Sequence, residues 1–169
     1  IPSILTEALG VTFDDHIGHD FIDDYQTRYD FYHRKEEKIP FNLEYFDKIT
    51  KGGLSNKTLN VALAGTGVGK SLFMCNMASA SLMQGRNVLY ITLEMAEEKI
   101  AERIDANLLD VNIQDLSDLP HQVYENKIIK LAGKTHGKLI IKEYPTASAH
   151  AGHFGSLLNE LSVKKGFQP

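Results

Sequence analysis

Apolar residues recur along this chain with two periods that alternate after about residue 39. Three short runs are apolar at most or at alternate positions, as in buried strands. The predicted strands are Thr58–Ala64, Asn87–Leu93 and Lys138–Lys142. Four longer stretches are apolar on one side at helical spacing. The predicted helices are Ser71–Gln84, Ala96–Leu109, Pro120–Ala132 and His150–Lys164. This alternation predicts an α/β fold with a mainly parallel sheet.

A helical pattern precedes the alternation. Ser3–Leu9 predicts a short helix and Asp20–Lys38 a longer amphipathic one, which Pro40 ends because proline disfavours helical geometry in the residue before it. The apolar stripe of the longer helix consists of Phe21, Tyr25, Tyr29 and Tyr32. Such an aromatic face needs a cover, which either its own domain or a neighbouring subunit can supply.

Composition narrows the class of protein. With 43% hydrophobic and 24% charged residues among 169, the chain is typical of a soluble globular protein. No apolar run approaches the length of a membrane span, and no signal peptide opens the chain. A net charge of −4 does not indicate nucleic-acid binding, so any DNA contact must come from a local patch or from residues outside the chain.

The cysteine and histidine residues do not predict a metal site. The single cysteine, Cys75, lies within a predicted helix and is expected in the core of a protein from a reducing compartment. The pairs His16/His19 and His150/His153 lack convincing carboxylate or cysteine partners, so exposed or helix-capping roles are favoured.

A glycine-rich turn between the first predicted strand and the first helix of the α/β region carries the clearest chemistry. Its residues are Ala64, Gly65, Thr66, Gly67, Val68, Gly69, Lys70 and Ser71. Strand, glycine-rich turn and helix form the context of a phosphate-binding loop, whose amide groups and helix N-terminus face an anion. Lys70 is placed for the β- and γ-phosphates, and the Ser71 hydroxyl for Mg²⁺. The pattern usually opens with Gly, where this chain has Ala64, but a methyl group is tolerated at the end of a strand.

A second chemical group follows the second predicted strand. Glu94 falls at the carboxyl end of that strand, where ligands bind in open α/β sheets. A carboxylate there can act as a general base on an attacking water. The alternative is that Glu94 only favours the start of the next helix through its dipole. An apolar run closed by the Asp that supports Mg²⁺ in such enzymes is not found, because Leu139-Ile140-Ile141 is followed by Lys142.

Three runs resemble the ATPase domain of hexameric replicative DNA helicases of the DnaB family. They are Lys51-Gly52-Gly53-Leu54, the loop ending Gly69-Lys70-Ser71, and Thr92-Leu93-Glu94-Met95. Family members show a GG-L run before the first strand and an S-L-E-M run after the second, where Thr92 keeps the hydroxyl. They also show an arginine after that glutamate, matched here by Arg103. The match covers Ile39–Asp110 well, and several details are similar to the branch of the family found in T-even bacteriophages.

The resemblance implies a RecA-like P-loop NTPase fold and a ring of six identical subunits. It implies ATP and Mg²⁺ as ligands, ATP-driven movement along single-stranded DNA, and unwinding of duplex DNA. Glu94 matches the catalytic glutamate, Lys70 the phosphate-binding lysine and Ser71 the metal ligand. Residues 1–38 are then a helical linker or subunit-contact segment, and residues 39–169 the N-terminal part of the ATPase domain. Primase, a helicase loader and the cytoplasm of a bacterial host are the implied partners and location.

Both ends of the chain suggest a segment of a longer protein. The chain starts Ile1-Pro2 and stops at Pro169 within a repeating pattern. The Mg²⁺-associated Asp, the arginine finger and the DNA-contacting loops are therefore expected after Pro169, and the primase-contacting domain before Ile1. The isolated segment is expected to be inactive.

Two other functions fit the same residues. A RecA-like recombinase would share the fold and hydrolyse ATP on DNA filaments, although the GG-L and T-L-E-M runs argue against it. A nucleotide-gated assembly module without its own catalysis would use the phosphate loop alone.

Overall fold

The computed structural model describes residues 18–34 and 36–169 of the chain. The chain divides into two compact units between Glu36 and Glu37, and each is described by itself. The predicted helix Ser3–Leu9 and His16 lie outside the described residues. The division of the chain into a subunit-contact segment and an ATPase domain stays a prediction.

The first unit contains helix α2, Tyr25–His33. A turn over residues 21–24 precedes this helix. The carboxylate of Asp20 stabilises the turn by accepting hydrogen bonds from the backbone N–H groups of Ile22 and Asp23, both at 2.9 Å. The helix ends at His33 rather than at the predicted Lys38, because Arg34 is already extended and Lys38 belongs to a strand. The four aromatic side chains of the predicted stripe are all exposed.

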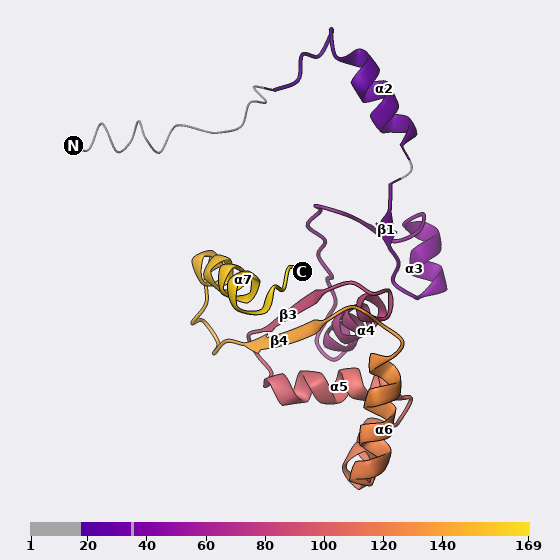
Figure 1. Ribbon diagram of the computed structural model, residues 1–169, viewed down its shortest axis with the longest axis vertical. Helices are drawn as coiled ribbons and strands as arrows, with labels where there is room; N and C mark the ends of the chain where they lie inside the picture. Colours follow the sequence, from indigo (N-terminus) through magenta and orange to yellow (C-terminus); the bar gives the residue numbers. More distant parts are fainter. Residues whose placement is uncertain (1–17, 35) are drawn as a thin grey trace, which may run out of the picture. The chain divides into compact units, whose positions relative to one another are not determined.

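The second unit is built on two parallel strands. These strands, β3 (Val88–Thr92) and β4 (Leu139–Glu143), pair in parallel with Val88 opposite Leu139 and Thr92 opposite Glu143. They lie side by side in Figure 1, with helices around them. The helices are α4 (Lys70–Met83), α5 (Glu97–Leu109), α6 (His121–Ala132) and α7 (Ala151–Lys165), with a 3₁₀ helix over Ile113–Asp118. The four helices and two strands of the predicted alternation are therefore confirmed within one or two residues.

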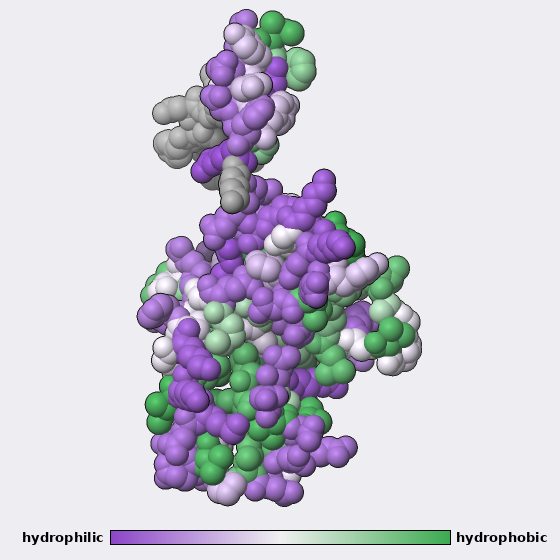
Figure 2. Space-filling view, turned by 90° about the vertical axis from the view of Figure 1, so that its right-hand side faces the viewer, coloured by the Kyte–Doolittle hydropathy of each residue, from purple (hydrophilic) through white to green (hydrophobic). Residues whose placement is uncertain are grey.

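Helices α4 and α5 pack on one face of this strand pair. Cys75 and Ala78 of α4 and Ile100 and Ile104 of α5 form the buried cluster, and Cys75 is 2% exposed. The strand residues packed against this cluster are Val88, Tyr90, Leu139 and Ile141. They alternate along β3 and β4, so they share a face of the sheet. Figure 2 shows other hydrophobic side chains, in green, reaching the surface between hydrophilic ones.

Within the second unit, a small β-hairpin-like group of elements, which we call the β1–β2 pair, precedes α4. Strands β1 (Lys38–Ile39) and β2 (Leu54–Ser55) pair around helix α3 (Glu44–Ile49). The side chain of Asn76 on α4 donates to the carbonyl of Phe41 at 3.3 Å, and the rings of Phe41 and Phe73 lie 5.9 Å apart. These contacts attach the segment between β1 and α3 to α4.

The predicted strand Thr58–Ala64 is wrong: residues 58–64 form no strand. Leu59, Val61 and Leu63 are 93%, 81% and 95% exposed. A cavity of about 630 Å³ is lined by this segment and by Phe73, Met74 and Met77 of α4. The physical reason is that a strand exists only through ladder partners, and no described strand pairs with these residues. The apolar pattern of residues 58–64 alone therefore does not produce a strand.

Two histidines cap the start of helix α7. The ring nitrogen Nδ1 of His150 accepts from the backbone N–H of Gly152 at 3.1 Å, and Nδ1 of His153 accepts from the N–H of His150 at 3.2 Å. This pair of contacts is a capping box, so the capping interpretation is confirmed for these two histidines. Within the described residues, no helix has the length and apolar character needed to cross a bilayer.

Candidate functional site

The predicted phosphate loop forms the turn that leads into α4. Gly67 and Gly69 have φ angles of 75° and 102°, in the left-handed region that favours glycine. Gly69 is the N-cap of α4, and Lys70 and Ser71 are its first two residues. The turn therefore requires glycine at these two positions, which explains the spacing of the motif.

The first turn of α4 offers unpaired donors. Phe73 is the first residue whose N–H bonds back to the loop, to the carbonyl of Gly69 at 2.9 Å. Among the described residues, the N–H groups of Lys70, Ser71 and Leu72 donate to no acceptor, and neither the Lys70 ammonium nor the Ser71 hydroxyl has a side-chain partner. Free amides at a helix N-terminus, beside a lysine, suit an anion such as a phosphate chain.

The direction of α4 determines where the predicted phosphate loop lies relative to Glu94. A short turn joins α4 to β3, and the N–H of Arg86 donates to the carbonyl of Ser81 at 3.1 Å. Further back along the helix, the Sγ of Cys75 lies 4.0 Å from the hydroxyl of Tyr90 on β3. Helix and strand therefore run in opposite directions, and the start of α4 lies toward the carboxyl end of β3. The predicted phosphate loop and Glu94 are thus on the same edge of the strand pair.

Glu94 itself lies in the bend between β3 and α5, residues 93–96, which we call the Glu94 loop. Its side chain is exposed and makes no hydrogen bond or ion pair with any described residue. The buried hydroxyl of Thr92 accepts from the N–H of Met95 at 3.1 Å and donates to the Met95 carbonyl at 2.9 Å. The threonine that replaces serine in the T-L-E-M run therefore closes the turn around Glu94 through its hydroxyl.

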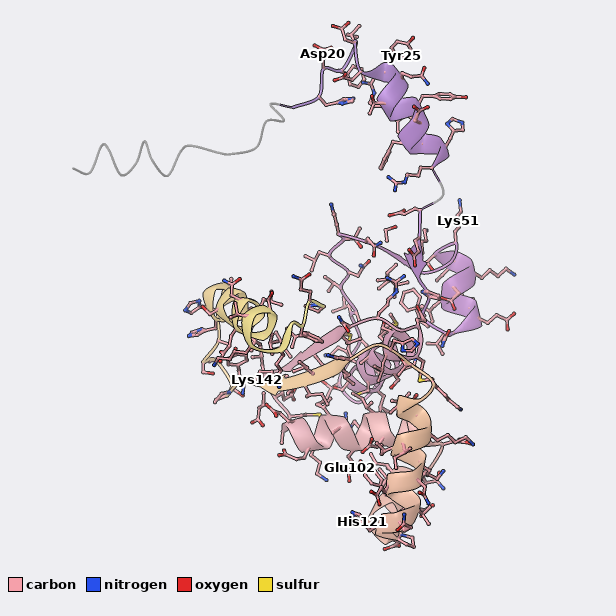
Figure 3. The ribbon with its side chains drawn as sticks, viewed as in Figure 1. Asp20, Tyr25, Lys51, Glu102, His121 and Lys142 are labelled. Atoms are coloured by element: carbon pink, nitrogen blue, oxygen red, sulfur yellow. The ribbon has the colours of Figure 1, made fainter. Side chains whose placement is uncertain are left out.

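The Glu94 loop is bordered by a polar contact between α5 and β4. The carboxylate of Glu97 accepts from the N–H of Glu143 at 2.8 Å, and that of Glu143 accepts from the N–H of Glu97 at 3.4 Å. Lys142 forms an ion pair with Glu97 at 3.5 Å. The hydrogen bond from the Glu143 backbone, and then the charge of Lys142, lower the pKa of the Glu97 carboxyl. Figure 3 shows Lys142 on β4, at the end where the chain continues toward α7.

These bordering residues were not predicted from the sequence. Glu97 and Glu143 belong to no motif, and Lys142 was noted only because an Asp was sought there. They come together because Thr92 and Glu143 are opposite each other in the ladder. Register between strands so distant along the chain leaves no local pattern, so no signal in a single sequence could have identified them.

Comparisons with known proteins relate this chain to a family of helicase domains and to two longer proteins. Residues 39–151 match the family described as the DnaB-like helicase C terminal domain. A "DnaB-like replicative helicase" of Enterobacteria phage T4 is 51% identical over 172 residues, which cover 100% of this chain and 36% of the relative. A "DNA repair protein RadA" of Campylobacter jejuni is 32% identical over 100 residues, covering 59% of this chain and 22% of that protein. The chain thus spans only about a third of the length of the phage relative.

Proposed function

Because this chain belongs to the DnaB-like helicase C-terminal domain family, we propose that it is the ATP-binding and hydrolysing motor segment of a ring-shaped replicative DNA helicase. In that protein, ATP hydrolysis drives movement along single-stranded DNA and separation of the duplex. The observation that carries the proposal is one edge of the strand pair. At that edge, the backbone donors at the start of α4 and the Glu94 carboxylate after β3 have no partner among the described residues.

The donor set of the loop fits a nucleoside triphosphate with its Mg²⁺. The amide groups of residues 70–72 receive phosphate oxygens, and the Lys70 ammonium neutralises charge on the β- and γ-phosphates. The Ser71 hydroxyl, which has no partner among the described residues, is an oxygen ligand of the kind that Mg²⁺ prefers. When bound, Mg²⁺ supplies positive charge against the phosphates.

Glu94 provides the base in this proposal. Its carboxylate orients a water toward the γ-phosphate and accepts a proton from it, which is general-base catalysis. Exposure of the side chain and the absence of a described partner leave the carboxylate available for that water. The whole protein is proposed to act as a homo-hexamer, with primase and a helicase loader as partners.

One observation favours a second candidate. Similarity to the RadA relative is compatible with a DNA-dependent ATPase of the recombinase type, which would use the same loop and glutamate. Electron microscopy of the whole protein with ATP and single-stranded DNA separates the two functions. Closed six-membered rings support the helicase, and continuous filaments on DNA support the recombinase.

The nucleotide site is tested by Lys70→Ala in the whole protein. Loss of the ammonium removes charge-assisted hydrogen bonds to phosphate, so the Kd for ATP, measured by titration calorimetry, should rise by about 10- to 100-fold. Lys130→Ala is the matched control, because Lys130 is an exposed lysine on α6, outside the phosphate loop and the other family runs. An unchanged Kd in Lys70→Ala would contradict the assignment of the loop.

A further inference from the structure

The orientation of Glu94 depends on its backbone. No described side chain or backbone group contacts its carboxylate through a hydrogen bond or ion pair. Burial does not fix it either, because the side chain is exposed. A general base must lie within hydrogen-bond reach of the water that it activates. The groups that hold the Glu94 loop therefore decide where the base stands.

One hydrogen bond reaches the peptide group next to Glu94. The hydroxyl of Thr146 donates to the carbonyl oxygen of Leu93 at 2.9 Å. That carbonyl belongs to the peptide unit that joins Leu93 to Glu94. Because a peptide unit is planar, holding its oxygen also constrains the position of the Glu94 Cα, to which the side chain is attached, and leaves the φ and side-chain torsions of Glu94 to place the carboxylate.

The far end of the loop is held by β4, the strand that precedes Thr146 in the chain. The reciprocal contacts between Glu97 and Glu143, at 2.8 and 3.4 Å, tie the first residue of α5 to the last residue of β4. Between the two ends, the Thr92 hydroxyl closes the turn at Met95. The Glu94 loop is thus attached at its start, at its middle and at its end.

The segment that carries Thr146 is itself anchored. The N–H of Tyr144 donates to the carbonyl of Thr92 at 2.9 Å and extends the β3–β4 ladder. The ring of Tyr144 packs edge-on against Phe154 of α7, with centroids 5.8 Å apart, and lies under the ammonium of Lys142. A donor on an anchored segment can position its acceptor, whereas a donor on a free loop cannot.

We propose that Thr146, together with the Glu97–Glu143 pair, positions the general base by holding the Glu94 loop against the end of β4. In this proposal Thr146 is a positioning residue, which acts on Glu94 through the Leu93 carbonyl. This inference rests on the proposed ATPase function, and it adds a part of the site that lies outside the phosphate loop and the T-L-E-M run.

The test compares steady-state ATP hydrolysis of four forms of the whole protein: wild type, Thr146→Val, Thr146→Ser and Ser148→Ala. Valine keeps the branched shape and removes the hydroxyl, whereas serine keeps the hydroxyl. Ser148→Ala is the matched control, because that hydroxyl donates to the Pro145 carbonyl at 2.6 Å and not to the Glu94 loop. Thermal unfolding of each form reports whether it is folded.

Thr146→Val should lower kcat by about three- to tenfold, the effect of losing one hydrogen bond that orients the base. KM for ATP should stay within about twofold, because phosphate binding does not use this bond. Thr146→Ser and Ser148→Ala should keep kcat within about twofold of the wild-type value. If Thr146→Val does not fold, Glu97→Met tests the same attachment from α5, with the same expected loss of kcat.

A double variant separates positioning from a general structural defect. In a Glu94→Gln background there is no base to position, so adding Thr146→Val should lower kcat by less than about twofold. A full three- to tenfold loss in that background, or an unchanged kcat in Thr146→Val alone, would overturn the inference. If Glu94→Gln itself hydrolyses ATP at the wild-type rate, the proposed function fails instead, which keeps the two failures distinguishable.

Discussion

The hydroxyl of Tyr90 lies 4.0 Å from the Sγ of Cys75, between β3 and the helix that begins at the phosphate loop. Burial raises the pKa of Tyr90 from its ordinary value of 10.0 to about 12, and it also raises the pKa of the Cys75 thiol. This helix–strand contact therefore favours neutral side chains. It gives the packing behind the phosphate loop a dependence on alkaline pH.

Tyr90 should contribute stability that is complete below about pH 10 and is lost as the pH rises toward 12. In that range the unfolded chain releases the phenolic proton while the folded chain retains it, so unfolding is favoured as pH rises. Tyr90→Phe cannot release this proton, and its urea midpoint should fall less steeply than that of the wild type between pH 9 and about 11.5. Tyr45→Phe, at an exposed tyrosine, is the control. Equal slopes for wild type and Tyr90→Phe would refute this role of Tyr90.

Glu94→Gln should separate nucleotide binding from catalysis in the whole protein. Glutamine keeps the size and hydrogen-bonding capacity of the side chain but does not accept the proton of the attacking water. The Kd for ATP should stay near the wild-type value, whereas kcat should fall by about 10²–10⁴-fold, the usual contribution of a general base. Calorimetry and steady-state turnover measure the two quantities. A parallel loss of affinity and kcat would assign Glu94 to structure or to metal binding.

Gly53 should not tolerate a side chain. Its φ is 119°, and a Cβ there would stand 2.1 Å from the carbonyl oxygen of Ile39, a backbone atom of β1. Gly53→Ala should therefore separate β1 from β2 and lower the free energy of unfolding by about 3 kcal/mol or more. Gly52→Ala is a matched control, because its φ is 108° but the nearest atom to its Cβ is 3.9 Å away. Denaturant titration of both variants should show the larger loss for Gly53→Ala, and equal losses would contradict the steric argument.

Residues 1–169 alone should hydrolyse ATP negligibly and should self-associate. The Mg²⁺-associated Asp and the arginine finger are not found in this sequence, and such an arginine is worth about 10³–10⁵ in rate in related sites. The apolar side chains of Leu59, Val61 and Leu63 are exposed, which favours association between copies of the segment. Size-exclusion chromatography should show aggregates that Leu59→Lys/Leu63→Lys reduces. Robust turnover by a monodisperse species would show that this segment already contains a complete site.

Helices and strands that are encoded by a long periodic run of apolar residues could be predicted from the sequence. Helices α4 to α7 and strands β3 and β4 have runs long enough for their periodicity to show, and their ends match within one or two residues. Strands β1 and β2 have two residues each, which is too short for any periodicity, so they were missed. The predicted strand at residues 58–64 failed for a different reason. Alternation reports suitability for a sheet, whereas a strand also needs a partner.

In the candidate site, too, residues that are neighbours in the sequence could be predicted, whereas residues brought together by folding could not. The turn of the predicted phosphate loop could be located because Gly67, Gly69, Lys70 and Ser71 follow one another closely along the chain, whereas phosphate binding by this turn stays a prediction. The T-L-E-M run could be located but not explained, since the role of the Thr92 hydroxyl at Met95 appears only in the folded turn. The contacts of Glu97 and Thr146 depend on strand register and could not be read from the sequence.

The parallel pairing of β3 with β4 also implies an order of folding. Asn87 and Lys138, which meet at the start of the ladder, are 51 residues apart, whereas only a short turn separates α4 from β3. Closing a long loop costs more chain entropy than closing a short one, so contacts of high sequence separation tend to form late. We therefore expect the phosphate loop, α4 and β3 to assemble first. The Glu94 loop would reach its final geometry only when β4 docks, so the ability to bind nucleotide would precede the ability to hydrolyse it during folding.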